Sequence, residues 1–268
     1  MEKKHRSAVN LLDRKGFKVV LALVSGLVFI TLWQILTTLS DIPSFIFPKP
    51  LEVWHRFVKV ILDGSLLFHT GVTLIEVLLG LFLGVSMAIV LGYLLAKSVL
   101  VEKVLAPYIV ASQSIPIVAI APLLVIWLGP GILSKILTSS LIVFFPVLVN
   151  TIVGIRSVPD ELYDLMKILQ ANPWQRLRML EIPASLPVFL GGLRIGATLA
   201  VIGAVVGEFV GADRGLGFLV NVGRGRYDTA LVFVAIFTLI VMAILLYGTV
   251  VLLENKLLAW KKRETSLD

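Results

Sequence analysis

The chain has 268 residues, of which 58% are hydrophobic and 15% are charged, and it carries a formal net charge of +7 and no cysteine. Soluble proteins average about 25% charged residues, and a soluble fold of this size cannot bury so much apolar surface. The composition therefore favours a polytopic membrane protein over a soluble enzyme, a nucleic-acid-binding protein or a disordered chain, and it excludes disulfide bonds and thiolate metal sites.

Six apolar stretches are long enough to cross a membrane, which takes about 20 mostly apolar residues in a helix. They are continuous, and lipid offers no partners for backbone groups, so we expect an all-α polytopic membrane protein. The first stretch is too long for a signal-peptide core and has no small-residue cleavage pattern, so we expect it to be retained. The predicted spans are 17–39, 72–96, 104–128, 132–154, 186–210 and 231–253.

The basic residues divide unevenly between the two sides of such a bundle. Six spans place both termini on one side, and sixteen of the 24 Lys and Arg residues fall on that side. Arg194 lies in the fifth span. The positive-inside rule then places both termini in the cytoplasm. The net charge reflects orientation and attraction to anionic lipid, with no nucleic acid implied. The seven basic residues on the other side are Lys49, Arg56, Lys59, Lys135, Arg214, Arg224 and Arg226.

The external segment between the first two spans predicts a helix lying at the outer membrane surface. Trp54, Phe57, Val58 and Ile61 recur at i, i+3, i+4 and i+7, which makes one apolar stripe. This helix either caps the bundle or docks a partner.

Small residues recur every four positions in the second and fifth spans, which lets helices approach closely. Two interpretations remain open: static packing, or a face that slides between two states. The residues are Gly80, Gly84, Ala88 and Gly92 in the second span and Gly192, Gly196, Ala200, Gly203, Gly207 and Gly211 in the fifth.

The third span contains three prolines, at 107, 116 and 122, and polar residues precede the second one. A proline inside a helix removes a backbone hydrogen bond and can kink the helix. Polar groups beside such a kink are typical of a wet cavity, so Gln113, Ser114 and Pro116 are candidates for the lining of a pore. Interhelical hydrogen bonding alone is the alternative.

Few ionisable residues lie near the spans, because a central charge is costly there. Glu76 continues the small-residue face of the second span, and Arg194 can reach water at the inner side. Glu208 lies near the outer end of the fifth span, within reach of Arg214. We expect structural roles for all three. In the alternative, Glu208 and the glycine-rich turn 211–217 form part of an external gate.

The cytoplasmic segment 156–183 predicts a helix, a break and a second helix. Pro159 and the two acidic residues after it suit a helix start. Asn172-Pro173 ends the first helix, since proline cannot continue it. This arrangement exceeds what a short connector needs, and it either packs under the bundle or docks a cytoplasmic partner. The apolar stripe on the first helix comprises Leu162, Leu165, Met166 and Leu169.

This segment resembles the cytoplasmic loop of type I ABC importer permeases, which carries an E-A-A triplet, a glycine four positions on, and a closing I-x-L-P-type pattern. In this chain Asp164-Leu165-Met166 lie at the position of the triplet. Gln170 lies at the position of the glycine and is followed by Ala171. Glu181-Ile182-Pro183 close the pattern. A tight turn that needed glycine would be strained by Gln170, which predicts a different local backbone. The stretch SQSIPIVAIAPLLVIWLG in the third span is similar to the subgroup that takes up nitrate, sulfonate, taurine and thiamine precursors.

The resemblance implies that this chain is the permease subunit of an importer for a small solute. Riboflavin is a further candidate for that solute. The resemblance also implies a second permease copy as a homodimer, cytoplasmic ABC ATPase subunits and an external solute-binding protein. Residues 67–255 would form the ABC type-1 transmembrane domain, after a tail, span and external helix at 1–66 and before a tail at 256–268. The ATPase-coupling residues would be Asp164, Leu165, Met166, Leu169, Gln170 and Ala171.

Other classes of function have less support. The chain lacks the G-x-x-x-x-G-K-[ST] pattern of ATP-binding loops, so we expect it to need a separate ATPase and to be no enzyme itself. Its three histidines have no metal-ligand spacing, and no catalytic motif, metal or cofactor is indicated. An ion-coupled transporter or channel is the alternative, but it would favour carboxylates at mid-membrane.

Overall fold

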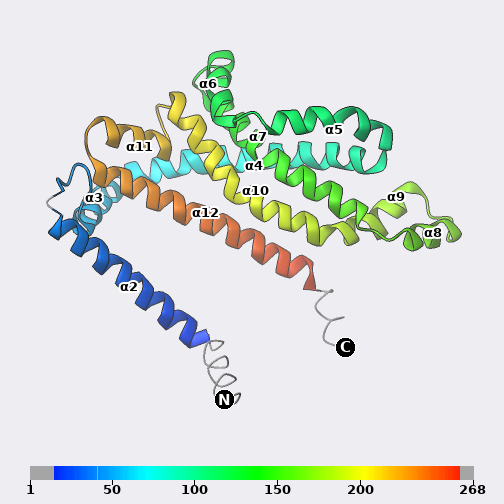
Figure 1. Ribbon diagram of the computed structural model, residues 1–268, viewed down its shortest axis with the longest axis horizontal. Helices are drawn as coiled ribbons and strands as arrows, with labels where there is room; N and C mark the ends of the chain where they lie inside the picture. The colour runs from blue at the N-terminus through cyan, green and yellow to red at the C-terminus, as the bar shows by residue number, and fades with distance from the viewer. Residues whose placement is uncertain (1–14, 41, 260–268) are drawn as a thin grey trace.

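The computed structural model describes residues 15–40 and 42–259, and for part of the first helix only its backbone (Figure 1). This described part is helical and contains no strand, which confirms the all-α class. The helices in chain order are α2 (Lys15–Leu39), α3 (Pro50–Leu62), α4 (Ser65–Lys97), α5 (Val99–Gln113), α6 (Ile117–Leu128), α7 (Ile132–Arg156), α8 (Asp160–Ile168), α9 (Pro173–Arg176), the π-helical turn η1 (Leu177–Glu181), α10 (Ile182–Gly211), α11 (Leu216–Gly225) and α12 (Thr229–Leu257).

Helix α7 lies at the centre of the bundle, packed along both α4 and α10. The glycines explain how three helices approach so closely. A Cβ atom on Gly80 of α4 would lie 2.5 Å from the Cβ of Ser139, and one on Gly203 of α10 would lie 2.5 Å from the Cα of the same serine. Ser139 Oγ also donates a hydrogen bond to the carbonyl of Ala200 at 2.9 Å. The small-residue stripes therefore pack mainly against α7.

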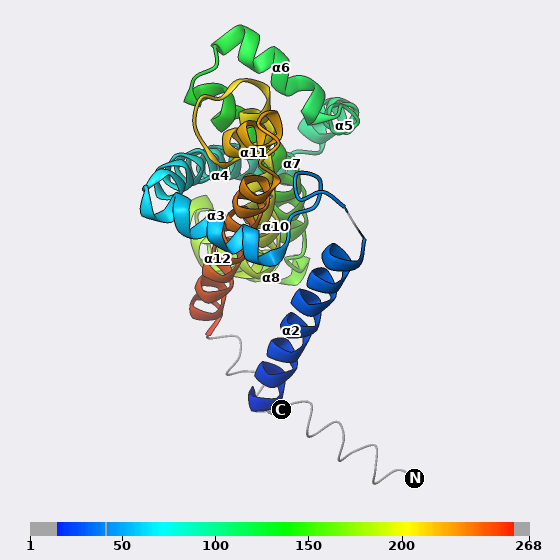
Figure 2. The same ribbon diagram turned by 90° about the vertical axis from the view of Figure 1, so that its left-hand side faces the viewer.

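Four helical segments are long and apolar enough to cross a membrane, and they match the second, fourth, fifth and sixth predicted spans. They are α4, α7, the continuous run from α9 to α10, and α12. Helix α2 has the 25-residue length of a span, and most of its described side chains from Leu23 onward are apolar and exposed. Figure 2 shows α2 standing apart from the bundle. Trp33 anchors it, because its indole N–H donates to the Pro48 carbonyl at 3.1 Å.

The prediction that the third span is one helix with a proline kink is wrong. Residues 99–128 form two helices, α5 and α6, bent by 94°. The break falls at Pro116, the N-cap of α6, which has no N–H to donate and disfavours helical geometry at Ile115. The bend is therefore far larger than a proline kink within one helix.

The external amphipathic helix is present as α3, and three of the four predicted stripe residues are half-buried, whereas Trp54 is exposed. Val53 and Val60 are buried, Phe57 between them is half-buried, and Trp54 is 59% exposed. The helix is rotated from the expected position because it packs against α12, where Arg56 pairs with Asp228 at 2.7 Å.

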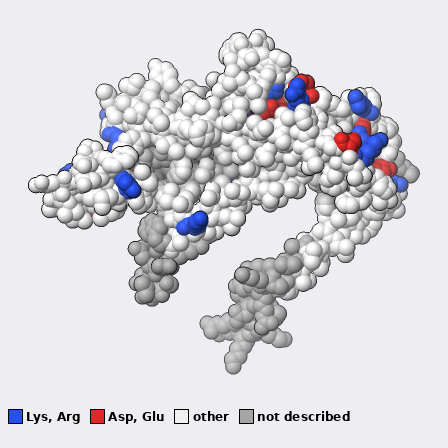
Figure 3. Space-filling view, turned by 180° about the vertical axis from the view of Figure 1, so that it is seen from behind, with Lys and Arg blue, Asp and Glu red and all other residues white. Residues whose placement is uncertain are grey.

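Charged side chains gather toward the two ends of the molecule, and a broad uncharged surface lies between them (Figure 3). We call the end that carries α8 and α9 the loop end, and the end that carries α3 and α11 the far end. This distribution fits a bundle whose middle lies in lipid.

Candidate functional site

The segment between α7 and α10 projects beyond the bundle at the loop end (Figure 1). Helix α8 begins after Pro159, carries Asp160 and Glu161 in its first turn and Lys167 in its last, and has no buried residue. These charges suit the partial positive and negative ends of the helix dipole. The predicted helix–break–helix is therefore present, and its first helix is held away from the core.

Gln170 ends α8 in a left-handed backbone conformation, with φ of +52°. The Ala171 N–H donates to the Met166 carbonyl and the Gln170 N–H to the Lys167 carbonyl, each at 2.9 Å. This pair of bonds is a Schellman motif, in which glycine is the usual residue at the left-handed position. The expectation that Gln170 would change the local backbone is wrong, because these bonds hold the tight turn with glutamine in it.

The second helix starts immediately after this turn. Asn172 Oδ1 accepts from the Gln175 N–H and Gln175 Oε1 accepts from the Asn172 N–H, both at 2.8 Å. This reciprocal capping box, with Pro173 at the first helical position, fixes where the chain turns back toward the bundle. The tip of the loop is thus geometrically defined on both sides of Gln170.

Four large apolar side chains are exposed on this tip: Leu165, Ile168, Leu169 and Trp174, which we call the loop patch. Ile168 is 78% exposed. Grouped exposed apolar residues on a water-facing surface are typical of an interaction site. Leu165 and Leu169 belong to the apolar stripe predicted from the sequence, whereas Ile168 and Trp174 do not. Trp174 directly after the Asn-Pro break was the available signal.

Asp164, Leu162 and Met166 belong to the same loop but differ in their surroundings. Asp164 is exposed and its carboxylate pairs with Lys167 one turn on, at 2.7 Å. Leu162 is exposed, and Met166 is half-buried. An exposed ion pair of this kind contributes little to stability, so Asp164 remains available to a partner.

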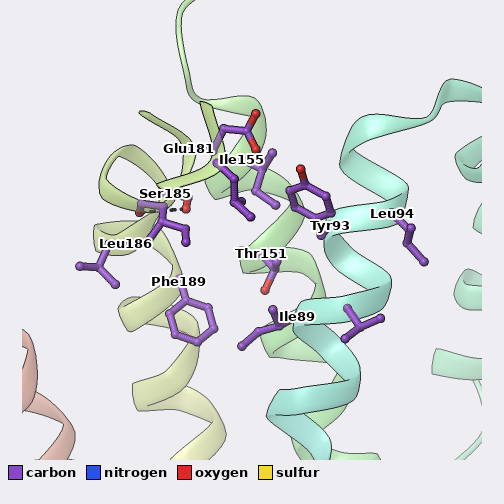
Figure 4. A pocket seen from close by; sticks show the side chains of 12 residues that line it. Ile89, Tyr93, Leu94, Thr151, Ile155, Glu181, Ser185, Leu186 and Phe189 are labelled. Carbon is purple, nitrogen blue, oxygen red and sulfur yellow. Dashed lines mark hydrogen bonds between the residues drawn. The ribbon is translucent and has the colours of Figure 1, made fainter. Parts of the chain in front are cut away.

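A cavity of about 480 Å³ lies beside the loop, between α4, α7 and α10. Its wall is almost entirely apolar. Figure 4 shows Ile89 and Tyr93 projecting from α4 and Phe189 from α10, with Glu181 at the end of the cavity nearest the loop.

Glu208 is completely buried at the far end of α10 and holds the chain that follows it. Its carboxylate accepts from Thr73 Oγ1 at 2.6 Å and from the Gly217 N–H. Thr73 Oγ1 in turn accepts from the Leu216 N–H at 2.7 Å. The glycine-rich turn and the start of α11 are therefore tied to α4. The suggested partner of Glu208, Arg214, pairs with its neighbour Asp213 instead.

Lys135, which was counted among the basic residues of the outer side, is a buried residue of the bundle. It lies in the first turn of α7, is only 2% exposed, and donates to the Gly131 and Gly211 carbonyls at 3.0 and 3.3 Å and to that of Pro130. A second cavity, of about 620 Å³, is lined by Lys135 together with buried Glu76 and the exposed pair Asp213 and Arg214. Buried Glu76, Glu208 and Lys135 thus surround one polar region at the far end. The sequence signal was a lysine inside the predicted span 132–154.

Arg194 has a structural partner, as expected. Its Nε lies 3.2 Å from Glu254 Oε2, which joins α10 to α12.

Gln113, Ser114 and Pro116 lie at the α5–α6 bend and are all exposed. Ser114 Oγ donates to the Val110 carbonyl within its own helix, at 3.4 Å. None of the three forms a hydrogen bond with Glu208, whose partners are Thr73 and Gly217, so the structure does not bring the predicted pore and gate residues together. Among the described residues, no group of three His, Asp or Glu side chains could hold a metal ion.

Comparison with known proteins gives the family. The model of the "binding-protein-dependent transport system inner membrane component" family matches residues 80–259. The riboflavin transport system permease protein RibX of Chloroflexus aurantiacus is 47% identical over 238 residues, covering 89% of each chain. The formylaminopyrimidine transport permease protein ThiX of Halalkalibacterium halodurans is 37% identical, covering 89% of this chain and 94% of the relative.

More distant matches agree with these. The taurine transport system permease protein TauC of Escherichia coli is 31% identical, over 91% of this chain and 90% of the relative. Among solved structures, the inward-facing MetNI methionine ABC transporter contains a chain with a TM-score of 0.64 at 17% identity. The match covers 73% of this chain and 97% of that one, and it shows a shared fold.

Proposed function

Because this chain belongs to the family of binding-protein-dependent transport system inner membrane components, and is the permease subunit of an ABC importer for a small solute, we propose that its loop patch is the docking surface for a separate ATPase subunit. Two permease copies form the translocation pathway, a solute-binding protein delivers the solute at the far end, and ATP is bound by the partner alone. The transporter domain spans 67–255. Both termini lie in the cytoplasm, and the far end faces outward.

One observation carries the docking proposal: a short helix with no buried residue presents the exposed loop patch beyond the bundle on a turn held by a Schellman motif and a capping box. Leaving large apolar side chains in water is unfavourable by about 25 cal/mol per Å². A partner that covers them regains this free energy, and the fixed turn reduces the conformational entropy lost on docking. The predicted coupling residues Asp164 to Ala171 all belong to this helix and turn.

Aspartate substitutions in the loop patch test the docking. We expect Ile168→Asp with Leu169→Asp to reduce co-purification of the tagged ATPase at least tenfold, because two carboxylates would have to be desolvated in the interface. The permease should still reach the membrane, since neither side chain is packed in the bundle. The matched control is Leu62→Asp on α3, where the leucine is 80% exposed at the far end. Normal co-purification of the double variant would refute the docking assignment.

We further propose that the solute is a flat nitrogen heterocycle of the riboflavin or aminopyrimidine type. The support is the order of the relatives. Those named for riboflavin and formylaminopyrimidine are 47% and 37% identical, whereas those named for aliphatic sulfonates and taurine are 32% and 31% identical. Titration calorimetry of the cognate binding protein with riboflavin, formylaminopyrimidine and taurine tests this. Tight binding of taurine alone would contradict the proposal.

A further inference from the structure

Lys97, the last residue of α4, joins three elements at the loop end. Its Nζ lies 2.6 Å from Glu181 Oε1 in η1 and donates to the Tyr163 hydroxyl of α8 at 3.0 Å. The same ammonium lies 4.6 Å from the centroid of the Tyr163 ring, within the range of a cation–π contact. We call Lys97, Glu181 and Tyr163 the Lys97 latch.

The burial of Glu181 makes its ion pair with Lys97 necessary. Glu181 is 4% exposed, and its second carboxylate oxygen has no hydrogen-bond partner. A buried carboxylate is tolerated only when it is paired, so Glu181 depends on Lys97. Glu181 also ends the π-helical turn, a type of irregularity often found at functional sites. A simple connector between helices would need neither the buried charge nor the irregular turn.

The path of the chain shows what the latch adds. Helix α8 continues through α9 and η1 into α10, so a displacement of α8 reaches α10 through the backbone. Helix α4 is separated from α8 by α5, α6 and α7 along the chain. Lys97 bridges this gap directly, since one ammonium contacts both α8 and the start of α10. Glu181 of η1 and Tyr93 of α4 also line the apolar cavity between α4 and α10 (Figure 4).

We propose that the Lys97 latch makes α4 move together with the loop, so that Lys97, Glu181 and Tyr163 are positioning residues that couple ATPase movement to the transport pathway. This inference rests on the proposed docking of the ATPase at the loop patch. Docking brings the ATPase to α8, and the latch carries the displacement to α4, whose small-residue face packs on α7. Without the latch, α4 is linked to the loop only through its packing against α7 and α10.

The test uses the full transporter, with ATPase and binding protein, in proteoliposomes. The double variant Lys97→Met with Glu181→Gln removes the ion pair without leaving one charge unpaired. We expect it to retain the ATPase and basal ATP hydrolysis, to lose most of the stimulation of hydrolysis by loaded binding protein, and to transport at least tenfold more slowly. Tyr163→Leu, which alters a partly exposed side chain, should give the same loss in weaker form. Exchanging the charges with Lys97→Glu and Glu181→Lys should restore part of the coupling.

The control is the neighbouring ion pair between Arg156 of α7 and Glu102 of α5, at 2.6 Å, which does not contact α8. Glu102→Gln should leave transport per ATP hydrolysed within about twofold of the wild type. A structural ion pair would change stability without changing that ratio. The latch is refuted if the double variant and Tyr163→Leu both transport normally per ATP, or if Glu102→Gln uncouples to the same extent. Loss of co-purification in the loop-patch variants is measured separately, so failure of docking is distinguishable from failure of the latch.

Discussion

Gln170 adopts a left-handed backbone conformation in which most side chains are strained. Its position in the sequence pattern predicts only part of this geometry. The resemblance marks the position as one where the family pattern has glycine, but it wrongly suggested that the backbone would change. The two carbonyl bonds on one side and the capping box on the other hold φ at +52° with glutamine in place of glycine. Such cooperation between neighbouring hydrogen bonds cannot be predicted from one residue identity.

Replacing Gln170 by glycine should therefore preserve the turn and modestly strengthen it. Glycine removes left-handed strain of about 1–2 kcal/mol, while its greater freedom in the unfolded chain offsets about 0.5–1 kcal/mol. Gln170→Val should do the reverse, because a β-branched residue is a poor fit at positive φ. Hydrogen exchange of the Ala171 amide checks both variants. Slower exchange in the valine variant than in the glycine variant would contradict the assigned geometry.

Glu208 supplies a second residue-scale prediction, because it serves as a hydrogen-bond acceptor for α4 and α11 at once. Glu208→Ala should destabilise the protein by about 2–5 kcal/mol, since the Thr73 hydroxyl and the Gly217 N–H would be left buried and unpaired. Glu208→Gln keeps one acceptor oxygen and should lose less than half as much. Thermal unfolding in detergent measures both. Equal loss in the two variants would show that the charge, rather than the hydrogen bonding, holds the turn.

At the scale of helices, continuous apolar length was the most reliable signal. It located α4, α7, α10 and α12 because a lipid-crossing helix must satisfy its backbone internally over about 20 residues. It failed at residues 99–128, where total length and apolarity suit one span but Pro116 separates two helices bent by 94°. The exposure of Trp54 on α3 has a different cause: periodicity identifies an amphipathic helix, but the packing partner decides which residues at the edge of its apolar stripe are buried.

The contact of α10 with α7 gives the prediction for an element. At Gly203 an added Cβ meets the backbone of Ser139, which cannot move aside, so Gly203→Ala should destabilise the fold by about 1–3 kcal/mol. Gly191 lies on the same helix with nothing within 4 Å of its added Cβ. Gly191→Ala should be neutral or stabilising by up to about 1 kcal/mol, from helix propensity alone. Melting temperatures in detergent compare the two. A similar loss in both variants would mean that the stripe is no packing face.

For the whole molecule, the sequence predicted class, family and the place of the loop, but it did not reveal how distant residues meet. Lys97, Tyr163 and Glu181 are widely separated along the chain, and no local pattern links them. Lys135 lies inside the predicted span 132–154 and was counted with the basic residues of the outer side, but a count of charges does not predict its burial. Its burial depends on three carbonyl groups, one of them contributed by α10.

Orientation in the membrane is the prediction that belongs to the whole molecule, and the chain is well suited to testing it because it contains no cysteine. The excess of basic residues on the side of the termini predicts that the loop end faces the cytoplasm and the far end faces outward. Single cysteines at Ile168 and Leu62 place an exposed thiol at each end. In intact spheroplasts, a membrane-impermeant maleimide should label Leu62→Cys fully and Ile168→Cys only after the membrane is permeabilised. Because positive charge on the cytoplasmic side fixes insertion for the bundle as a whole, the reverse labelling pattern would invert every assignment of loop end and far end together, including the docking side of the ATPase.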